Sequence, residues 1–238
     1  MKYAITILTL LILSLIECNA QTMKVIYSEK MDLTERLKSV DNPMIKQMII
    51  EKTGKPKYYE LTSSNGTSIY QKQNVDEREI DDAITIQGDE KIIYKNHINK
   101  TFVKQIDFMS RTFLIEDTLE KNDWIITNDT LKIGEYQCKK ATLKKGDNNI
   151  IAWFTNEVPS NEGPEDFYGL PGLILKIETG ISIIEVQNIS ISKDKITIQK
   201  PTKGKKVTIK EFEKIRKEKI NGLNDGKQKD NGVQIIKM

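Results

Sequence analysis

Histidine and cysteine, the side chains that most often serve as bases, reactive thiols and zinc ligands, are few in this sequence. It holds one histidine, His97, and two cysteines, Cys18 and Cys138. Cys138 lies between Tyr136 and Lys140 in a strand-like segment, and free cysteine is among the most buried residue types. A reactive thiol needs an electropositive pocket and a nearby base, and nothing in the sequence brings His97 to it. We therefore predict a buried, inert Cys138 and a His97 that lies in a surface turn.

Motifs of the common catalytic and cofactor sites are also missing from the sequence. It contains no Gly-Xaa-Ser-Xaa-Gly elbow, no His-Glu-Xaa-Xaa-His helix and no phosphate-binding loop. Two His and Cys ligands, Cys138 and His97, are too few for the usual zinc site. The sequence therefore predicts no catalytic residue, no metal site and no cofactor, and it favours a protein that is not an enzyme.

Three carboxylates lie close together in one loop-like segment: Glu162, Glu165 and Asp166. Paired carboxylates can perform acid–base chemistry or bind a hard cation such as calcium. The segment lacks the spacing of a calcium-binding loop, and loop carboxylates are usually solvated. We predict that these three are solvated. A hydrolase that uses them remains a less favoured alternative.

Apolar and aromatic residues flank the same segment. One interpretation is an aromatic-lined mouth that binds an apolar ligand. The other is ordinary packing in the core and along the loop. The candidate ligand-binding residues are Trp153, Phe154, Phe167, Tyr168, Leu170 and Pro171.

The N-terminus has the pattern of a secretory signal peptide. Lys2 supplies a short positive region, residues 4–16 form an apolar run, and small residues end at Ala20. We predict cleavage after Ala20 and export to the periplasm or the outer membrane. Cys18 would suit a lipoprotein signal, but Glu17 stands where that signal needs a small residue.

Short β-strand patterns separated by turn residues dominate the rest of the chain. Their spacing favours a mainly β fold with an antiparallel sheet over a parallel α/β fold. The predicted strands are Thr22–Ser28, Lys57–Ser63, Thr67–Lys72, Lys91–Lys95, Thr101–Phe108, Arg111–Ile115, Asp123–Thr127, Ile133–Leu143, Asn149–Thr155, Leu173–Glu178, Ile183–Ile191 and Lys195–Gln199.

Two segments have helical patterns. Asp32–Glu51 is a minor N-terminal one, interrupted at Asn42-Pro43. Thr208 and Glu211 form a capping box that starts a C-terminal helix, and Gly222 can end it. We predict three parts: a signal peptide at 1–20, a β-rich domain at 21–200, and a basic helix with a flexible tail at 201–238.

Charge is distributed unevenly along the chain. The net charge is +3, yet residues 200–238 carry 12 Lys and Arg against 5 Asp and Glu. A solvated tail is the simpler interpretation, and contact with anionic lipid headgroups is the alternative. Nucleic acid is not a predicted partner, because the sequence contains no recognisable base-reading module.

Residues 169–174 read Gly-Leu-Pro-Gly-Leu-Ile. The pair Pro171-Gly172 favours a type II turn over 170–173, which would launch the strand after it. Through this motif the chain resembles the GLPGLI family. The resemblance extends to Gly134–Ala141, to Ala152–Thr155, and to Pro159 and Gly163-Pro164 in the loop, although Phe154 stands where the family usually has Tyr.

This resemblance implies a secreted protein of the Gram-negative envelope whose biochemical activity is largely undefined. At the level of the fold, the chain is similar to periplasmic lipoprotein carriers, which implies an open β half-barrel capped by helices; a fold does not define a function. We expect a non-catalytic binding or carrier module for an apolar or peptide ligand. The alternative is an accessory protein that docks on an outer-membrane receptor through a strand edge or the basic helix.

Overall fold

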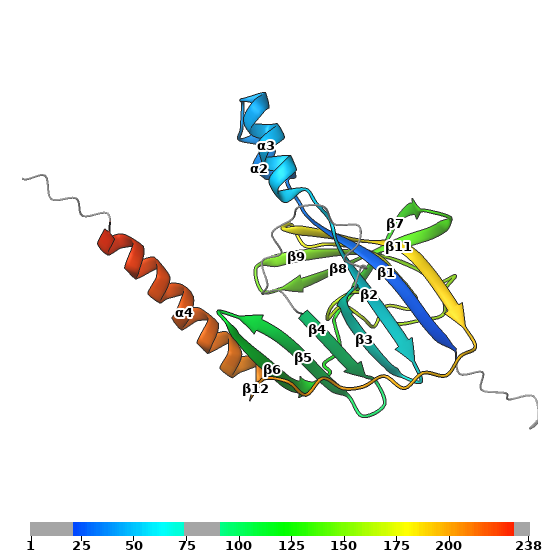
Figure 1. Cartoon of the computed structure of the whole chain (residues 1–238). Coiled ribbons are helices and arrows are strands. Elements are labelled where there is room, and N and C mark those ends of the chain that lie inside the picture. Colours follow the sequence, from blue (N-terminus) through cyan, green and yellow to red (C-terminus); the bar gives the residue numbers. More distant parts are fainter. Residues whose placement is uncertain (1–20, 74–90, 231–238) are drawn as a thin grey trace, which may run out of the picture.

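The computed structural model describes residues 21–73 and 91–230 (Figure 1). The predicted signal peptide at 1–20 lies outside the described residues. Twelve strands form one sheet in the order β12-β6-β5-β4-β3-β2-β1-β11-β10-β9-β8-β7. They are β1 (Thr22–Met31), β2 (Lys57–Ser64), β3 (Thr67–Lys72), β4 (Lys91–Asn96), β5 (Thr101–Phe108), β6 (Arg111–Thr118), β7 (Ile125–Ile133), β8 (Tyr136–Lys145), β9 (Asn148–Thr155), β10 (Leu173–Glu178), β11 (Ser182–Ser192) and β12 (Lys205–Val207).

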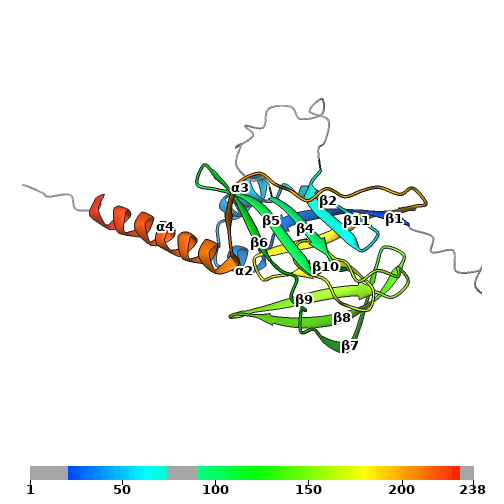
Figure 2. The ribbon, with the colours of Figure 1, turned by 90° about the horizontal axis from the view of Figure 1, so that it is seen from below.

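The sheet is an open half-barrel, as predicted. Neighbouring strands are antiparallel except β12, which pairs with β6 in parallel. β12 and β7 are the two edges, and the sheet does not close between them. Figure 2 shows β7, β8 and β9 lying across from the strands of the other half. Irregular register at Ile26/Tyr27 and at Ile174/Lys176 accompanies this curvature, since bulges bend a strand.

One main core cluster joins the two halves of the curved sheet. It combines residues of β1–β4 with residues of β8–β10. Strand alternation puts every second side chain there: Val25 and Tyr27 of β1 are buried, whereas Lys24 is exposed. The Tyr27 hydroxyl donates a hydrogen bond to Ile174 O at 2.7 Å. The first strand is thereby tied to the strand that follows the Leu-Pro-Gly turn.

An extended segment, residues 193–204, covers the other face of β4, β5 and β6. Asp194 O accepts a hydrogen bond from Thr22 Oγ1 at 2.5 Å. Figure 1 shows the segment in orange, crossing the strands on its way to β12. The predicted strand Lys195–Gln199 was wrong, because this segment crosses the sheet instead of pairing along an edge. Its Ile198 packs on three buried residues: Tyr94, Val103 and Leu114.

Two helices form an arm between β1 and β2: α2 (Thr34–Lys38) and α3 (Pro43–Thr53). The predicted helix is present, and so is its interruption. Asn42 Oδ1 accepts a hydrogen bond from the Met44 backbone N–H at 2.9 Å, and Pro43 occupies the first turn. Both features start a new helix. Neither helix has a buried residue, and the arm projects away from the sheet (Figure 1).

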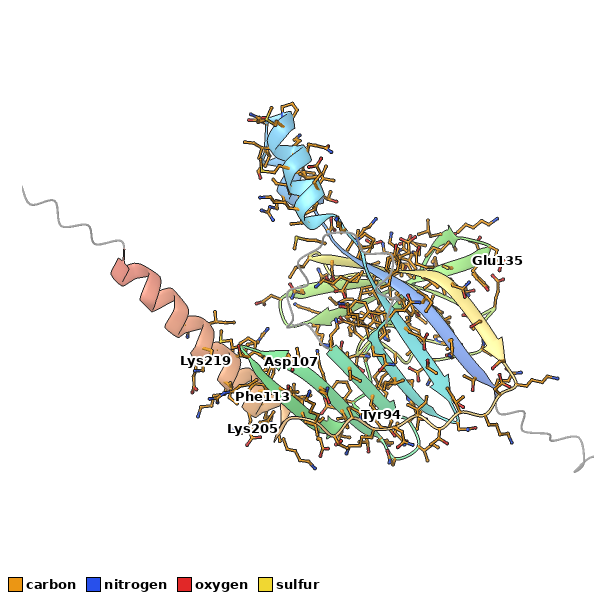
Figure 3. All side chains as sticks on the ribbon, viewed as in Figure 1. Tyr94, Asp107, Phe113, Glu135, Lys205 and Lys219 are labelled. Carbon is orange, nitrogen blue, oxygen red and sulfur yellow. The ribbon has the colours of Figure 1, made fainter. Side chains whose placement is uncertain are left out.

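The C-terminal helix α4 (Ile209–Asp230) packs only its first turns on the sheet. The Phe212 ring lies 5.3 Å from the Phe113 ring, in a cluster with Val207. Figure 3 places Phe113 and Lys205 at the base of this helix and Lys219 further along it. In residues 21–73 and 91–230, no helix has the length and hydropathy needed to cross a membrane.

The start of α4 was predicted correctly and its end was not. The Thr208 N–H donates to Glu211 Oε2 at 2.7 Å, and the Glu211 N–H donates to Thr208 Oγ1 at 3.2 Å. These two bonds are the predicted capping box. The predicted stop at Gly222 was wrong, because the helix continues through it to Asp230. A glycine inside a helix weakens it without ending it.

Two predicted features of the chain between β7 and β10 differ in detail. The predicted strand Ile133–Leu143 is divided, because Gly134 has a φ of +57° and turns β7 into β8. The predicted type II turn was also wrong. The Gly172 N–H donates to Leu170 O at 2.8 Å, which is a three-residue turn around Pro171.

Candidate functional site

The loop between β9 and β10, residues 156–172, is fixed to the sheet by ion pairs. Each of the three carboxylates from 162 to 166 meets a lysine of a strand. The prediction of solvated carboxylates was wrong, because strands distant in sequence bring these lysines to the loop. The pairs are Glu162 with Lys95 at 2.9 Å, Glu165 with Lys91, and Asp166 with Lys145 at 2.5 Å.

Lys95, Glu162 and His97 form a buried charged cluster, here called the Lys95 cluster. The side chains of Lys95 and Glu162 are 0% and 3% exposed, and that of His97 is 20% exposed. Lys95 Nζ also donates a hydrogen bond to Gly163 O at 3.1 Å. His97 Nε2 lies 2.8 Å from Glu162 Oε1. An ionised carboxylate only accepts hydrogen bonds, so Nε2 carries the proton.

Tyr168 packs against the same cluster. Its ring lies edge-on to the His97 ring at 5.3 Å, and Lys95 Nζ lies 5.7 Å from its centroid. At such a distance a cation is attracted to the face of an aromatic ring. The Tyr168 hydroxyl donates to Glu120 O. Tyr168 therefore contributes to packing and to the electrostatics of the cluster.

Backbone hydrogen bonds set the position of Glu162. Its N–H donates to Ser160 Oγ at 3.2 Å, and its carbonyl accepts from the Ile174 N–H at 3.0 Å. The Gly169 N–H donates to Asn161 O at 2.7 Å. The loop is therefore bound to its own far end and to β10, and Glu162 is held in one place against Lys95.

The Lys95 cluster makes stability depend on pH. Burial opposes ionisation of Glu162, but Lys95 and His97 outweigh it and lower its pKa from 4.5 to about 2. A depressed folded-state pKa gives a stabilisation that is complete above about pH 5 and is lost as pH falls toward the folded value. We expect wild type to lose roughly 3 kcal/mol more than Glu162→Gln over this range. Urea unfolding of both proteins at several pH values measures it, and parallel pH curves would contradict it.

A small cavity of about 260 Å³ adjoins the Lys95 cluster. It lies at the end of β1 and β2 where the β2–β3 turn comes close to the loop. His97 and Glu162 form part of its wall. Met23, Ser63, Ser64 and residues 158–161 are among the others. Its wall therefore combines polar groups with apolar side chains.

A larger cavity of about 410 Å³ lies at the opposite end of β1 and β2. We call it the arm cavity, because Thr53 and Lys55 line it where the chain leaves α3. Its wall combines an apolar part with several charges. The apolar and aromatic residues are Met31, Tyr59, Ile106 and Ile181; the charged ones are Glu29, Lys30, Lys55, Lys57, Lys91 and Asp107.

Lys91 connects the arm cavity to the loop. Its Nζ pairs with Glu165 of the loop and lies 3.5 Å from Glu29 Oε2 of β1. It also lies 5.0 Å from the centre of the Tyr59 ring. Burial alone would lower the pKa of Lys91, but Glu165 and Glu29 raise it above its ordinary value. Lys91 is therefore a cation whose charge two carboxylates already balance.

The six predicted ligand-binding residues do not form one aromatic mouth. Phe154, Phe167, Tyr168 and Leu170 are buried, and three of them belong to the main core cluster. Trp153, which precedes Phe154 in β9, is half-buried and packs against the same cluster. Pro171 is exposed. These positions give the residues packing roles, and their binding of a ligand remains a prediction.

Cys138 is buried, as predicted, and His97 is not a simple surface residue. Burial raises the pKa of the Cys138 thiol to about 11, so the reactive thiolate is scarce near neutral pH. His97 does lie in a turn, but its ring is bound to Glu162. Among the described residues, no three His, Cys, Asp or Glu side chains gather as metal ligands would.

The two lysines of β4 are among the site residues that sequence reasoning missed. A weak signal was present in the segment Lys91-Ile92-Ile93-Tyr94-Lys95. Lys91 and Lys95 lie on the same face of the strand as Ile93, because side chains alternate with a period of two. Ile93 is fully buried. Lysines on the same strand face as a core residue predict buried ammonium groups, and such groups need carboxylate partners.

Comparison with known proteins identifies no activity. A model of a family described as a protein of unknown function (Porph_ging) matches residues 144–176, the segment with the loop and the Leu-Pro-Gly turn. No curated protein matches the chain. Membership of the GLPGLI family therefore remains a prediction.

Two solved structures share the fold. Both are structures of PNGF-II, in the C2 and P21 space groups, with TM-scores of 0.52 and 0.53 and identities of 18% and 17%. They match 82% of this chain, which spans 32% and 33% of the length of the PNGF-II chains. At this identity the likeness shows the fold alone.

Proposed function

We propose that the chain is an exported binding or carrier module of the cell envelope, and that the arm cavity holds an apolar ligand with an acidic group. The observation that carries this proposal is the composition of that cavity. An open space of about 410 Å³ has an apolar wall and a charged rim, which is the usual character of a small-molecule site.

The sign of the charges favours an acidic ligand. The wall holds four lysines against two carboxylates, Glu29 and Asp107. Lys91 is already balanced by Glu29 and by Glu165 of the loop. Lys30 and Lys55 also line the cavity, and their charge would attract a carboxylate or phosphate group.

Export and envelope location are part of the same proposal. They rest on the signal-peptide pattern that ends at Ala20 and on the resemblance to the GLPGLI family. A carrier needs no catalytic group, which agrees with the lack of catalytic motifs in the sequence. The pairing of Asp166 with Lys145 also disfavours a general acid at this position, because the effect of burial on the carboxyl is outweighed by Lys145, which lowers its pKa.

Ile181→Glu tests the cavity. Ile181 is 66% exposed at the rim, so the variant folds, but its carboxylate repels an acidic ligand and removes apolar contact. We expect Ile181→Glu to weaken binding of dodecyl phosphate at least about tenfold. Dodecanol, which lacks the charge, should bind wild type more weakly than dodecyl phosphate. Isothermal titration calorimetry measures both.

Ile125→Glu is the matched control. Ile125 is 68% exposed on the edge strand β7 and does not line the arm cavity. The Ile125→Glu variant should have the same affinity for dodecyl phosphate as wild type. Equal loss in both variants, or no binding by wild type, would reject the arm cavity as the ligand site.

The second candidate function is docking on an outer-membrane receptor through a sheet edge. β7 is the free edge next to β8. It exposes Ile125, Ile126 and Leu131, and an exposed apolar edge strand can pair with a strand of a partner. Recovery of one receptor from envelope extracts by wild type, but not by a β7 variant with Pro in place of Thr130, would favour this function over the carrier.

A further inference from the structure

The α2–α3 arm carries an apolar face that packs on nothing in the described structure. Neither helix has a buried residue. Helices of 5 and 11 residues are marginal in water unless one face is buried. Four large apolar residues of α3 are exposed: Met44, Ile45, Met48 and Ile50. Such a helix is stabilised when a partner covers it.

The helical period gathers three exposed apolar residues on one side of α3. Met44, Ile45 and Met48 lie there, at spacings of one and four residues. Gln47 and Glu51 border this side, and the Gln47 Nε2 donates to Glu51 Oε1 at 3.0 Å. These two polar groups satisfy each other, whereas the three apolar side chains are exposed to solvent.

The chain around this apolar side has a net positive charge. Residues 30–57, from the end of β1 through the arm to the start of β2, carry seven Lys and Arg against four Asp and Glu. Lys52 follows Met48 by one helical turn, and Lys46 lies beside Ile45. Apolar side chains flanked by lysines suit the surface of an anionic bilayer. There the apolar side chains can contact acyl chains, and the lysines can contact the anionic headgroups.

The arm and the arm cavity are continuous. Thr53 ends α3, and it lines the cavity together with Lys55 and Met31. A membrane that received the apolar side of α3 would therefore lie beside the entrance of the cavity. That arrangement suits transfer of an amphipathic ligand between bilayer and protein without passage through water.

We propose that the α2–α3 arm docks on an anionic lipid bilayer, with Met44, Ile45 and Met48 among the acyl chains and Lys46 and Lys52 on the headgroups. This goes beyond the proposed ligand site, because docking does not require an occupied cavity. A protein partner would offer a surface of fixed shape to α3. The mixed apolar and basic character matches a bilayer, which offers acyl chains and anionic charge together.

Vesicle flotation tests the proposal without any added ligand. The protein is expressed with residues 1–20 present, recovered from the envelope, and mixed with vesicles of equal parts phosphatidylcholine and phosphatidylglycerol. We expect Met44→Gln with Met48→Gln to reduce vesicle binding at least about tenfold. Lys46→Gln with Lys52→Gln should reduce it about 25-fold, fivefold for each lysine.

Ile98→Gln is the matched control, because Met44 and Ile98 are both 76% exposed and Ile98 lies outside the arm. Ile98→Gln should bind vesicles as wild type does. The binding of both proteins to vesicles should fall in high salt. Vesicle binding that the arm variants leave intact would overturn the proposal. Failure of wild type to bind anionic vesicles would also overturn it and would favour a protein partner. Because no amphiphile is added, the outcome is independent of the arm-cavity test.

Discussion

We expect Glu162→Gln to lower the free energy of unfolding by about 3 to 5 kcal/mol, because it leaves a buried ammonium group without its counter-ion. Lys95 is 0% exposed and has Glu162 as its ion-pair partner at 2.9 Å. A neutral amide can still accept a hydrogen bond, but it cannot offset the cost of the buried charge. Urea unfolding at neutral pH, followed by circular dichroism, measures the loss.

A double-mutant cycle separates the ion pair from the shape of the site. Lys95→Met and Glu162→Met each remove one charge, and the double variant removes both. Two buried charges replaced together are often tolerated better than one. The double variant should therefore be more stable than the sum of the single changes predicts, by more than about 1 kcal/mol. Additive losses would show that Lys95 and Glu162 act independently.

We expect Gly172→Ala to destabilise the protein by about 3 kcal/mol or more, because the added methyl group meets backbone. A Cβ at Gly172 would lie 2.0 Å from Thr155 O and 2.6 Å from Thr155 C. Thr155 is the last residue of β9 and pairs with Leu173 of β10. Relief of the overlap would pull these strands apart just beyond the Lys95 cluster. Thermal and urea unfolding both report the loss.

Gly169→Ala is the control for Gly172→Ala. Gly169 has a φ of +91°, and no atom lies within 4 Å of its added Cβ. Its substitution should cost only the backbone strain of an L-residue in that region, about 1 to 2 kcal/mol. Equal losses at the two glycines would mean that conformation, not close packing, requires Gly172.

The two effects meet in one loop. Glu162 fixes its middle to β4, and Gly172 lets its end approach β9. Residues 144–176, which contain this loop, are the segment matched by the family model. The loop is therefore fixed to the sheet both in its middle and at its end, and its Phe167 and Leu170 are part of the main core cluster.

Local signals in the sequence were sufficient to predict most strands of the sheet. Thr67–Lys72, Thr101–Phe108 and Leu173–Glu178 have the predicted bounds, because alternation and turn residues act between near neighbours. The capping box of α4 was found for the same reason. Lys195–Gln199 has a strand-like pattern too, but a pattern does not specify a partner. The structure uses that segment to cover a face of the sheet.

Contacts between distant parts of the chain could not be predicted from such signals. His97 and Glu162 are 65 positions apart, and Lys95 and Gly163 are 68 apart. From sequence alone, a single lysine or loop carboxylate is predicted to be solvated. Its burial is favourable only when a residue of opposite charge is already in place. The chain alone thus specified most strands and the start of the C-terminal helix. The order of strands in the sheet brought the buried charges together and formed the two cavities described above.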